Sequence, residues 1–372
     1  MKKSLYIHIP FCSKRCYYCD FYSTIYRKDL AAALVDVFCQ QIESCDLAFD
    51  TVYIGGGTPT VLALDLLKKL FLKLRPITRG CKEFTVEANP ESLDEDKISL
   101  LLDYGVNRVS IGCQSFSDLK LNFLGRGHSA KQAISSVEKA KKKGFDNISM
   151  DLIYGLPMES HKLWQEDLTI ATKLPVTHLS AYMLTYEKGT NLYRGLEAGK
   201  ISPLSSDKVV LMYQQMVDYF TKNKFFQYEI SNFSKKGFKS IHNSNYWENK
   251  SYLGLGPSAC SFILGKRQRN ISSLPKYIKA VKEKEEIWEY SEKLSPAASA
   301  KETAALKIRT KEGIDFSWFR QKTGFSFLEI EQEALTLLLK QKLIKYGRGN
   351  RKKIELTKKG FLFADTVSAT FL

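Results

Sequence analysis

Three cysteines near the N-terminus have the residue type and the spacing of a metal-ligand set. Cys12, Cys16 and Cys19 form a C-x-x-x-C-x-x-C pattern within the segment SLYIHIPFCSKRCYYCDFYS. Three thiolates on one short loop can bind three irons of a cubane [4Fe-4S] cluster and leave the fourth iron without a protein ligand. An iron with an open position can bind and activate a small molecule, so this loop is the first candidate site.

Two structural explanations for the cysteines have less support. A structural zinc site needs a fourth Cys or His at matching spacing, but Asp, Phe, Tyr and Ser occupy positions 20 to 23 and no second C-x-x-C occurs. A disulfide framework is typical of short secreted chains, whereas this chain has 372 residues and only eight cysteines, and we expect no targeting segment before the first strand. We expect the other five cysteines to be buried, reduced thiols. They are Cys39, Cys45, Cys81, Cys113 and Cys260.

The charge of the chain is strongly positive. Lys and Arg exceed Asp and Glu by 56 − 40, which gives a formal net charge of +16. This charge suits nucleic acid, an acidic membrane surface or a carboxylate-bearing ligand, and it equally suits a basic solvated surface without a dedicated partner. No run of 18 or more apolar residues occurs, so we expect a soluble, cytoplasmic protein.

The order of apolar and amphipathic segments predicts which elements position the cysteine loop. We predict strands at SLYIHI, TVYIGG, EFTVEANP, VNRVSIG, NISMDLIYG and THLSAYML. We predict helices at residues 29–46, 62–74, 95–104, 129–143, 162–173 and 205–222. Strands separated by helices of this length pair in parallel through right-handed crossovers, so the pattern predicts an α/β fold, a partial (β/α)6 barrel of the TIM type.

In such barrels the functional groups gather at the C-terminal ends of the strands. The cysteine loop follows the first strand, Gly55-Gly56-Gly57-Thr58-Pro59 ends the second, and Glu87 ends the third. Gln114 follows the fourth strand and Asp151 lies on the fifth. We therefore expect all five positions to face one mouth of the barrel.

The composition changes between residues 266 and 296, where KRQRN and KAVKEKEEIWEYSEKLSP indicate a charged connecting region. We predict three units: a barrel at residues 1–235, a haem-motif and connecting region at 236–295, and a C-terminal domain at 296–372. In the last unit, predicted helices at 299–311, 315–323 and 327–342 precede a basic ribbon, LIKYGRGNRKKIELT, in an arrangement that resembles a winged helix. Such units also serve as packing modules, so we do not predict a nucleic-acid partner.

The cysteine loop, with Tyr18 between its last two cysteines, resembles the cluster loop of radical S-adenosylmethionine (SAM) enzymes. In that family SAM chelates the open iron, and an electron from the cluster cleaves SAM to a 5′-deoxyadenosyl radical. The resemblance implies that SAM is a cofactor, since carboxylates suit ribose hydroxyls and ammonium groups and an arginine suits a carboxylate. By motif and position it assigns SAM contacts to Tyr6, Tyr18, Gly56, Gly57, Thr58, Glu87, Gln114, Arg126 and Asp151.

The segments YIHIPFC, GGGTPT and DLIYGLP and the C-terminal region together resemble the oxygen-independent coproporphyrinogen III oxidase (HemN-like) superfamily over nearly the whole chain. The oxidases of that superfamily carry a fourth cysteine two residues after the third and a long N-terminal extension. Here Phe21 occupies the position of that cysteine, and five residues precede Tyr6. Both departures favour the haem-chaperone branch, HemW.

A second motif of that branch, H-N-x-x-Y-W, starts at residue 242. An imidazole is a common haem ligand and aromatic rings can stack on a porphyrin, so the resemblance implies haem binding by His242, Asn243, Tyr246 and Trp247. A packed, hydrogen-bonded histidine is the alternative. Relatives commonly carry a histidine where this chain has Cys260. A thiolate could replace that imidazole, although an inert cysteine is the simpler expectation.

These observations predict a haem chaperone on a radical SAM scaffold, which binds haem, a [4Fe-4S] cluster and SAM. It would deliver haem to acceptor haemoproteins, in particular respiratory ones at a membrane, where the positive charge would help peripheral contact. The enzymatic alternative is oxygen-independent coproporphyrinogen III dehydrogenase. A radical SAM enzyme that acts on RNA is a third possibility. Whether SAM is cleaved, and the oligomeric state, stay open.

Overall fold

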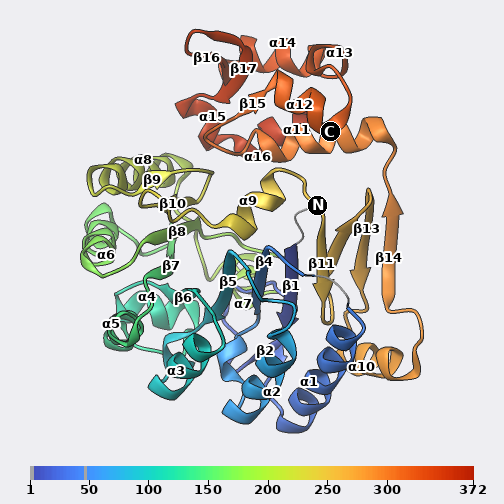
Figure 1. Ribbon diagram of the computed structural model, residues 1–372. Coiled ribbons are helices and arrows are strands. Elements are labelled where there is room, and N and C mark those ends of the chain that lie inside the picture. Colours follow the sequence, from blue (N-terminus) through green and yellow to red (C-terminus); the bar gives the residue numbers. More distant parts are fainter. Residues whose placement is uncertain (1–3, 46–47) are drawn as a thin grey trace.

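The computed structural model describes residues 4–45 and 48–372. A curved 12-stranded sheet runs through the larger part of the molecule, and helices cover its outer face (Figure 1). A smaller unit, drawn in orange to red, lies at one end of it. The strand order is β14-β13-β12-β11-β1-β4-β5-β6-β7-β8-β10-β9, so the sheet remains open at β14 and β9.

Six parallel strands form the centre of the sheet, and all six were predicted. They are β1 (Ser4–Ile9), β4 (Thr51–Gly56), β5 (Glu83–Ala88), β6 (Arg108–Gln114), β7 (Asn147–Tyr154) and β8 (His178–Met183). Every residue of β6 is buried. Its sequence, RVSIGCQ, nonetheless alternates between polar and apolar residues, and this period of two is the signal that predicts a strand.

The predicted helices follow these strands in turn. They are α1 (Lys28–Glu43), α2 (Leu64–Leu74), α3 (Glu95–Asp103), α5 (Ala130–Lys143), α6 (His161–Lys173) and α8 (Ser206–Lys222). The predicted end of the first helix, residue 46, lies outside the described residues. Helix α5 shows how such bounds arise: a capping box at Ser129 begins it and Gly144, at φ +119°, ends it. The alternation confirms the predicted partial (β/α)6 barrel.

Further short elements extend both edges of this sheet. Beside β1 lie β11 (Tyr252–Leu255), β12 (Cys260–Ile263), β13 (Lys266–Asn270) and β14 (Trp288–Lys293), and beyond β8 lie β10 (Asn232–Ser234) and β9 (Phe226–Gln227). Short helices α4 (Asp118–Leu124), α7 (Asn191–Glu197) and α9 (Ile241–Trp247) connect strands. A two-stranded pair, β2 (Phe11–Cys12) with β3 (Thr24–Ile25), brackets the cysteine loop.

The charged segment 266–296 contains regular secondary structure. Its elements are β13, α10 (Leu274–Glu283) and β14, none of which was predicted. The sequence did not indicate β14 because it is an edge strand with mostly exposed side chains, and charged residues are common on such strands. The domain boundaries proposed from the sequence stay a prediction.

The C-terminal unit has its own buried core, which includes Phe319, Phe327, Leu338 and Ile354. Its elements are α11 (Pro296–Lys307), β15 (Ile314–Asp315), α12 (Phe316–Thr323), α13 (Phe327–Ile330), α14 (Gln332–Lys340), β16 (Ile344–Gly347), β17 (Asn350–Leu356), α15 (Lys358–Leu362) and α16 (Ala364–Thr370). The helix predicted at 327–342 is divided at Glu331 into α13 and α14. The three strands form a separate sheet in the order β15-β17-β16.

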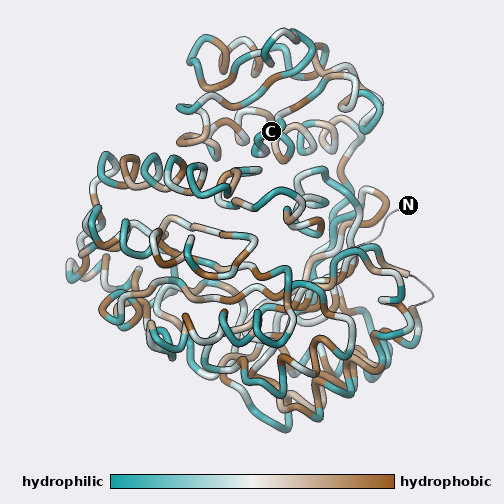
Figure 2. Tube along the Cα trace, turned by 60° about the vertical axis from the view of Figure 1, so that its left-hand side comes forward, coloured by the Kyte–Doolittle hydropathy of each residue, from teal (hydrophilic) through white to brown (hydrophobic). Residues whose placement is uncertain are grey.

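Apolar residues alternate with polar ones along most helices, as the brown and teal segments of the tube show (Figure 2). This is the pattern of helices that bury one face against a core. Among the described residues, no helix combines the length and the apolar character needed to cross a bilayer.

Candidate functional site

The cysteine loop leaves the C-terminal end of β1 and is fixed at its base by backbone hydrogen bonds. The amide of Thr24 donates to the carbonyl of Pro10 at 2.7 Å, and the amide of Tyr26 donates to that of Cys12 at 2.9 Å. The amide of Thr58, in the loop after β4, donates to Phe11 at 2.7 Å. The loop is therefore closed at both ends before any cofactor binds.

The three motif cysteines are half-buried free thiols that line one cavity of about 620 Å³. Burial raises the pKa of Cys12, and burial raises that of Cys19 to about 11. Two donors point at the sulfurs: the Thr58 hydroxyl lies 3.7 Å from Sγ of Cys12, and Nη1 of Arg126 lies 3.2 Å from Sγ of Cys16. Such donors favour thiolates, which are the metal-binding form.

The three thiols have the residue type and the placement around one cavity that an iron–sulfur cluster needs. Among residues 4–45 and 48–372, no group of three His, Cys, Asp or Glu side chains is arranged to hold one metal ion. In a cubane cluster each iron takes its own thiolate, so the thiols need to surround one cavity rather than meet at one point. Cys12, Cys16 and Cys19 would hold such a cluster, which supplies the electron for SAM chemistry when it is bound.

The glycine loop after β4 packs against the base of the cysteine loop. Gly56 has φ +109°, and a Cβ there would lie 2.6 Å from the ring of His8. A Cβ on Gly57 would lie 2.6 Å from the carbonyl oxygen of Phe11. Only residues without a side chain fit between these groups, so the glycines bring the backbone of β4 close to the cluster cavity.

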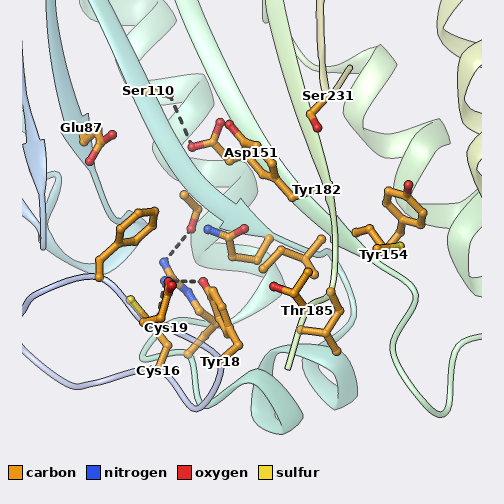
Figure 3. A pocket seen from close by; sticks show the side chains of 18 of the residues that line it. Cys16, Tyr18, Cys19, Glu87, Ser110, Asp151, Tyr154, Tyr182, Thr185 and Ser231 are labelled. Carbon is orange, nitrogen blue, oxygen red and sulfur yellow. Dashed lines mark hydrogen bonds between the residues drawn. The ribbon is translucent and has the colours of Figure 1, made fainter. Parts of the chain in front are cut away.

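Two half-buried carboxylates face the same cavity from β5 and β7 (Figure 3). Glu87 accepts a hydrogen bond from the Tyr53 hydroxyl at 2.6 Å and one from the Gly56 amide at 3.1 Å. Burial raises its pKa to about 7. Burial also raises the pKa of Asp151, to which the Ser110 hydroxyl donates at 3.5 Å. Carboxylates held this way are acceptors for ammonium or hydroxyl groups of a ligand.

Arg126 joins the cysteine loop to the strand ends. Its Nη2 donates to Oδ1 of Asn89 at 2.6 Å and to the carbonyl of Gly112 at 2.7 Å, while Nη1 faces Cys16. Its Nε is buried and has no hydrogen-bond partner among the described residues. Nearby Gln114 has φ +67°, an uncommon backbone conformation for a residue with a side chain. Strain of this kind concentrates at functional sites.

Eight of the nine residues predicted to contact SAM line this cavity. They are Tyr18, Gly56, Gly57, Thr58, Glu87, Gln114, Arg126 and Asp151. Tyr6 lies elsewhere: it lines a second cavity of about 430 Å³, and its hydroxyl is 3.0 Å from Nδ1 of His8. Tyr6 nevertheless lies close to the first cavity, because the ring of His8, its hydrogen-bond partner, packs against Gly56, and its own ring lies 6.2 Å from that of Tyr53, which is bonded to Glu87. Its contact with SAM stays a prediction.

Several lining residues carried no signal in the sequence. Figure 3 shows Ser110, Tyr182, Thr185 and Ser231 around the cavity with Cys16, Tyr18 and Cys19. Arg309, Phe361 and Asp365 reach the same cavity from the C-terminal unit. They are more than 280 residues from the cysteines, and no local spacing relates them to the cluster motif.

The predicted haem ligand His242 is a packed side chain in this structure. It is 1 % exposed, with Nδ1 2.9 Å from Oγ1 of Thr51 and Nε2 2.9 Å from the Tyr246 hydroxyl. Burial lowers its pKa to about 3, and the charge of Arg108 acts in the same direction. The N-terminus of α9 is fixed as well, because Glu83 accepts from the amides of residues 241 and 242.

The other three motif residues have different surroundings. Tyr246 lines the second cavity, whereas His242, Asn243 and Trp247 line neither of the two cavities described. The backbone amide of Asn243 donates a hydrogen bond to the hydroxyl of Ser240. The ring of Trp247 faces the guanidinium of Arg309, which lies 5.6 Å from the ring centre. Thus Tyr246 is the motif residue through which a ligand in the second cavity would contact this helix.

The second cavity lies beside the first. Phe21, which is 66 % exposed, lines both. Tyr22, Tyr252 and Cys260 also line it. Cys260 is half-buried, as are Cys45 and Cys81, so the expectation of a buried thiol holds only for Cys39 and Cys113. Because the cysteine loop contributes to both cavities, ligands in the two would be neighbours.

Comparison with known proteins defines the class first. Residues 6–169 match the family model of the Radical SAM superfamily, and membership implies a [4Fe-4S] cluster and SAM as cofactors. The protein named heme chaperone HemW of Lactococcus lactis is 36 % identical over 99 % of this chain and 97 % of its own length. The protein of the same name in Bacillus subtilis is 33 % identical over 100 % of this chain and 99 % of its own length. The chain belongs to the HemW family of radical SAM proteins.

A solved structure shares the fold. The coproporphyrinogen III oxidase HemN from Escherichia coli superposes with a TM-score of 0.86 over 100 % of this chain and 90 % of that one, at 23 % identity. This likeness confirms the fold class predicted from the strand and helix pattern.

Proposed function

We propose that this chain is a cytoplasmic haem chaperone on a radical SAM scaffold. It holds a [4Fe-4S] cluster on Cys12, Cys16 and Cys19 with SAM in the first cavity, binds haem beside the His242 motif, and passes it to acceptor haemoproteins. Full-length similarity to two proteins named heme chaperone HemW supports this proposal. Phe21 in place of the fourth cysteine supports it too.

The observation that carries the proposal is the position of Tyr246. It belongs to the H-N-x-x-Y-W motif and at the same time lines an aromatic cavity next to the cluster cavity. Flat aromatic ligands are held by stacking on such rings. His242 is the motif's proposed iron ligand, and its Nε2 would become available to iron when the whole Tyr246 side chain moves out of this hydrogen bond.

The test uses the full chain with its cluster reconstituted under anaerobic conditions. We expect one haem per chain, with transfer to an apo-haemoprotein, and a marked loss of binding in His242→Ala. Undiminished haem binding in this variant would refute the ligand assignment. With SAM, reductant and coproporphyrinogen present, formation of a vinyl-bearing porphyrinogen at useful turnover would overturn the chaperone function in favour of the dehydrogenase.

Delivery to respiratory haemoproteins predicts peripheral contact with a membrane. The net charge of +16 would favour the anionic surface of a bilayer. Co-sedimentation with vesicles that contain anionic lipid, lost at high salt, is the expected result. Equal sedimentation with neutral vesicles would contradict an electrostatic contact.

A further inference from the structure

Cys260 lines the second cavity and lies outside the His242 motif. Its thiol is a group that can bind iron. Several chain segments border this cavity: β1 contributes Tyr6, the cysteine loop contributes Phe21 and Tyr22, the region from α9 to β13 contributes Tyr246, Tyr252, Cys260 and Arg267, and α11 contributes Leu306. Its volume of about 430 Å³ is within the range of cofactor sites. A ligand there would contact mainly aromatic rings.

A glycine lies on β11, between the two strands that contribute Tyr6 and Cys260 to this cavity. Gly254 on β11 is in register with Tyr6 on β1, and a Cβ on Gly254 would lie 2.0 Å from the carbonyl oxygen of Cys260. The close approach of β11 and β12 therefore requires glycine here. This close approach brings the backbone of Cys260 next to Gly254, the residue in register with Tyr6, so Cys260 and Tyr6 border the same cavity.

Most donor atoms in and beside the cavity already have partners. Nδ1 and Nε2 of His8 lie 3.0 Å from the Tyr6 hydroxyl and 2.9 Å from the carbonyl of Tyr22. Both ring nitrogens of His242 are occupied by Thr51 and Tyr246. By contrast, Sγ of Cys260 makes no hydrogen bond within residues 4–45 and 48–372, so it can bind a metal without breaking an existing contact.

The strand next to Cys260 is basic. Cys260 is paired with Arg269 on β13, and Arg267 of the same strand lines the cavity. Arg267 lies 2.9 Å from Glu302 and stacks on the ring of Phe262 at 5.2 Å, so its guanidinium is held at the rim. A guanidinium there suits the carboxylate side chains of a tetrapyrrole.

We propose that the second cavity binds haem and that the thiolate of Cys260 is an iron ligand from the cavity side. The inference rests on the proposed haem-binding function and adds a ligand that the His242 motif does not supply. A thiolate is one of the axial ligands that haem iron accepts. As the Fe–S bond forms, the Cys260 thiol releases its proton to solvent and the iron loses a bound water; no electron is transferred.

The test is a haem titration of the full chain, followed by absorption and electron paramagnetic resonance spectra of the ferric complex. We compare wild type with Cys260→Ala and Cys260→His. Two matched controls are Cys81→Ala and Cys45→Ala, each of which removes a half-buried thiol that lines neither of the two cavities described. Circular dichroism verifies that each variant is folded.

We expect a thiolate-type spectrum in wild type and in both controls. Cys260→Ala should lose this spectrum and bind haem at least roughly tenfold more weakly, while Cys260→His should restore affinity with an imidazole-type spectrum. A wild-type spectrum and affinity in Cys260→Ala would overturn this inference and leave the chaperone function intact. Failure of the wild-type chain to bind haem stoichiometrically would overturn the proposed function itself, and the inference with it.

Discussion

The Tyr246 hydroxyl lies 2.9 Å from Nε2 of His242, between the histidine and the cavity that Tyr246 lines. On the other side of the ring, the Thr51 hydroxyl donates to Ser4, so its oxygen is left to accept from Nδ1–H of His242. This assigns the proton to Nδ1 and the lone pair to Nε2, which accepts from Tyr246. The nitrogen able to bind iron is therefore the one that Tyr246 covers.

The first prediction concerns Tyr246→Phe, which keeps the ring and removes the hydroxyl. The Nε2 lone pair of His242 then stays buried without a donor, which should lower the free energy of unfolding by about 1–3 kcal/mol. The uncovered nitrogen should also bind haem iron faster. Urea unfolding and stopped-flow absorbance measure the two effects, with Tyr252→Phe as control. Unchanged stability together with an unchanged association rate would contradict this role.

The second prediction is a pH dependence of stability caused by His242. Its pKa is about 3 in the folded chain and about 6.5 when unfolded, so the unfolded state binds a proton first as the pH falls. Its contribution to stability is complete above pH 6.5 and decreases below it, by about 2 kcal/mol at pH 5. We expect His242→Gln to lack this decrease. The difference in unfolding free energy between wild type and variant, at pH 7.5 and pH 5, isolates the effect from other histidines.

The third prediction concerns Glu87, whose pKa is shifted in the opposite sense, from 4.5 to about 7 by burial. The folded chain keeps this proton up to neutral pH, so the contribution is complete below pH 4.5 and is lost as the pH rises through 7. Wild type should lose about 3 kcal/mol relative to Glu87→Gln between pH 4.5 and 8, without SAM. Thermal unfolding across this range tests it. If the stabilities of wild type and Glu87→Gln change in parallel over this pH range, Glu87 ionises with an ordinary pKa.

The fourth prediction concerns Arg126→Lys, which keeps the charge but loses the forked contacts to Asn89 and Gly112. The cysteines are unchanged, so iron and sulfide content after reconstitution should stay close to wild type. SAM affinity should fall by at least about tenfold, because the amine cannot span the same acceptors. Isothermal titration with SAM gives the affinity. Equal loss of cluster and of SAM binding would instead make Arg126 a cluster-stabilising residue.

The sequence predicted the parts of the site that depend on local spacing. Cys12, Cys16 and Cys19 lie on one loop, and strand ends bring Glu87 and Asp151 to the same cavity because parallel strands of a barrel share one direction. Tyr6 lines the second cavity, which the motif could not indicate, because a motif gives a residue's distance along the strand but not which cavity its side chain enters.

Contacts between distant segments could not be predicted in this way. The burial of His242 depends on Thr51 and Glu83, which come from two strands far from it in the chain. The strand β14 was missed because its exposed charges do not show the alternation of a half-buried strand. Both cases depend on which distant segments pack against each other, and a single sequence does not specify these partners.

Helix α11 and the elements after it complete both cavities. Leu306 of α11 closes the second cavity, and Arg309, Phe361 and Asp365 close the first. These residues follow the cysteine loop by more than 280 positions, so the ribosome makes the loop well before the residues that close its cavity. A barrel without α11 and the later elements would present the three thiols in a more open cavity.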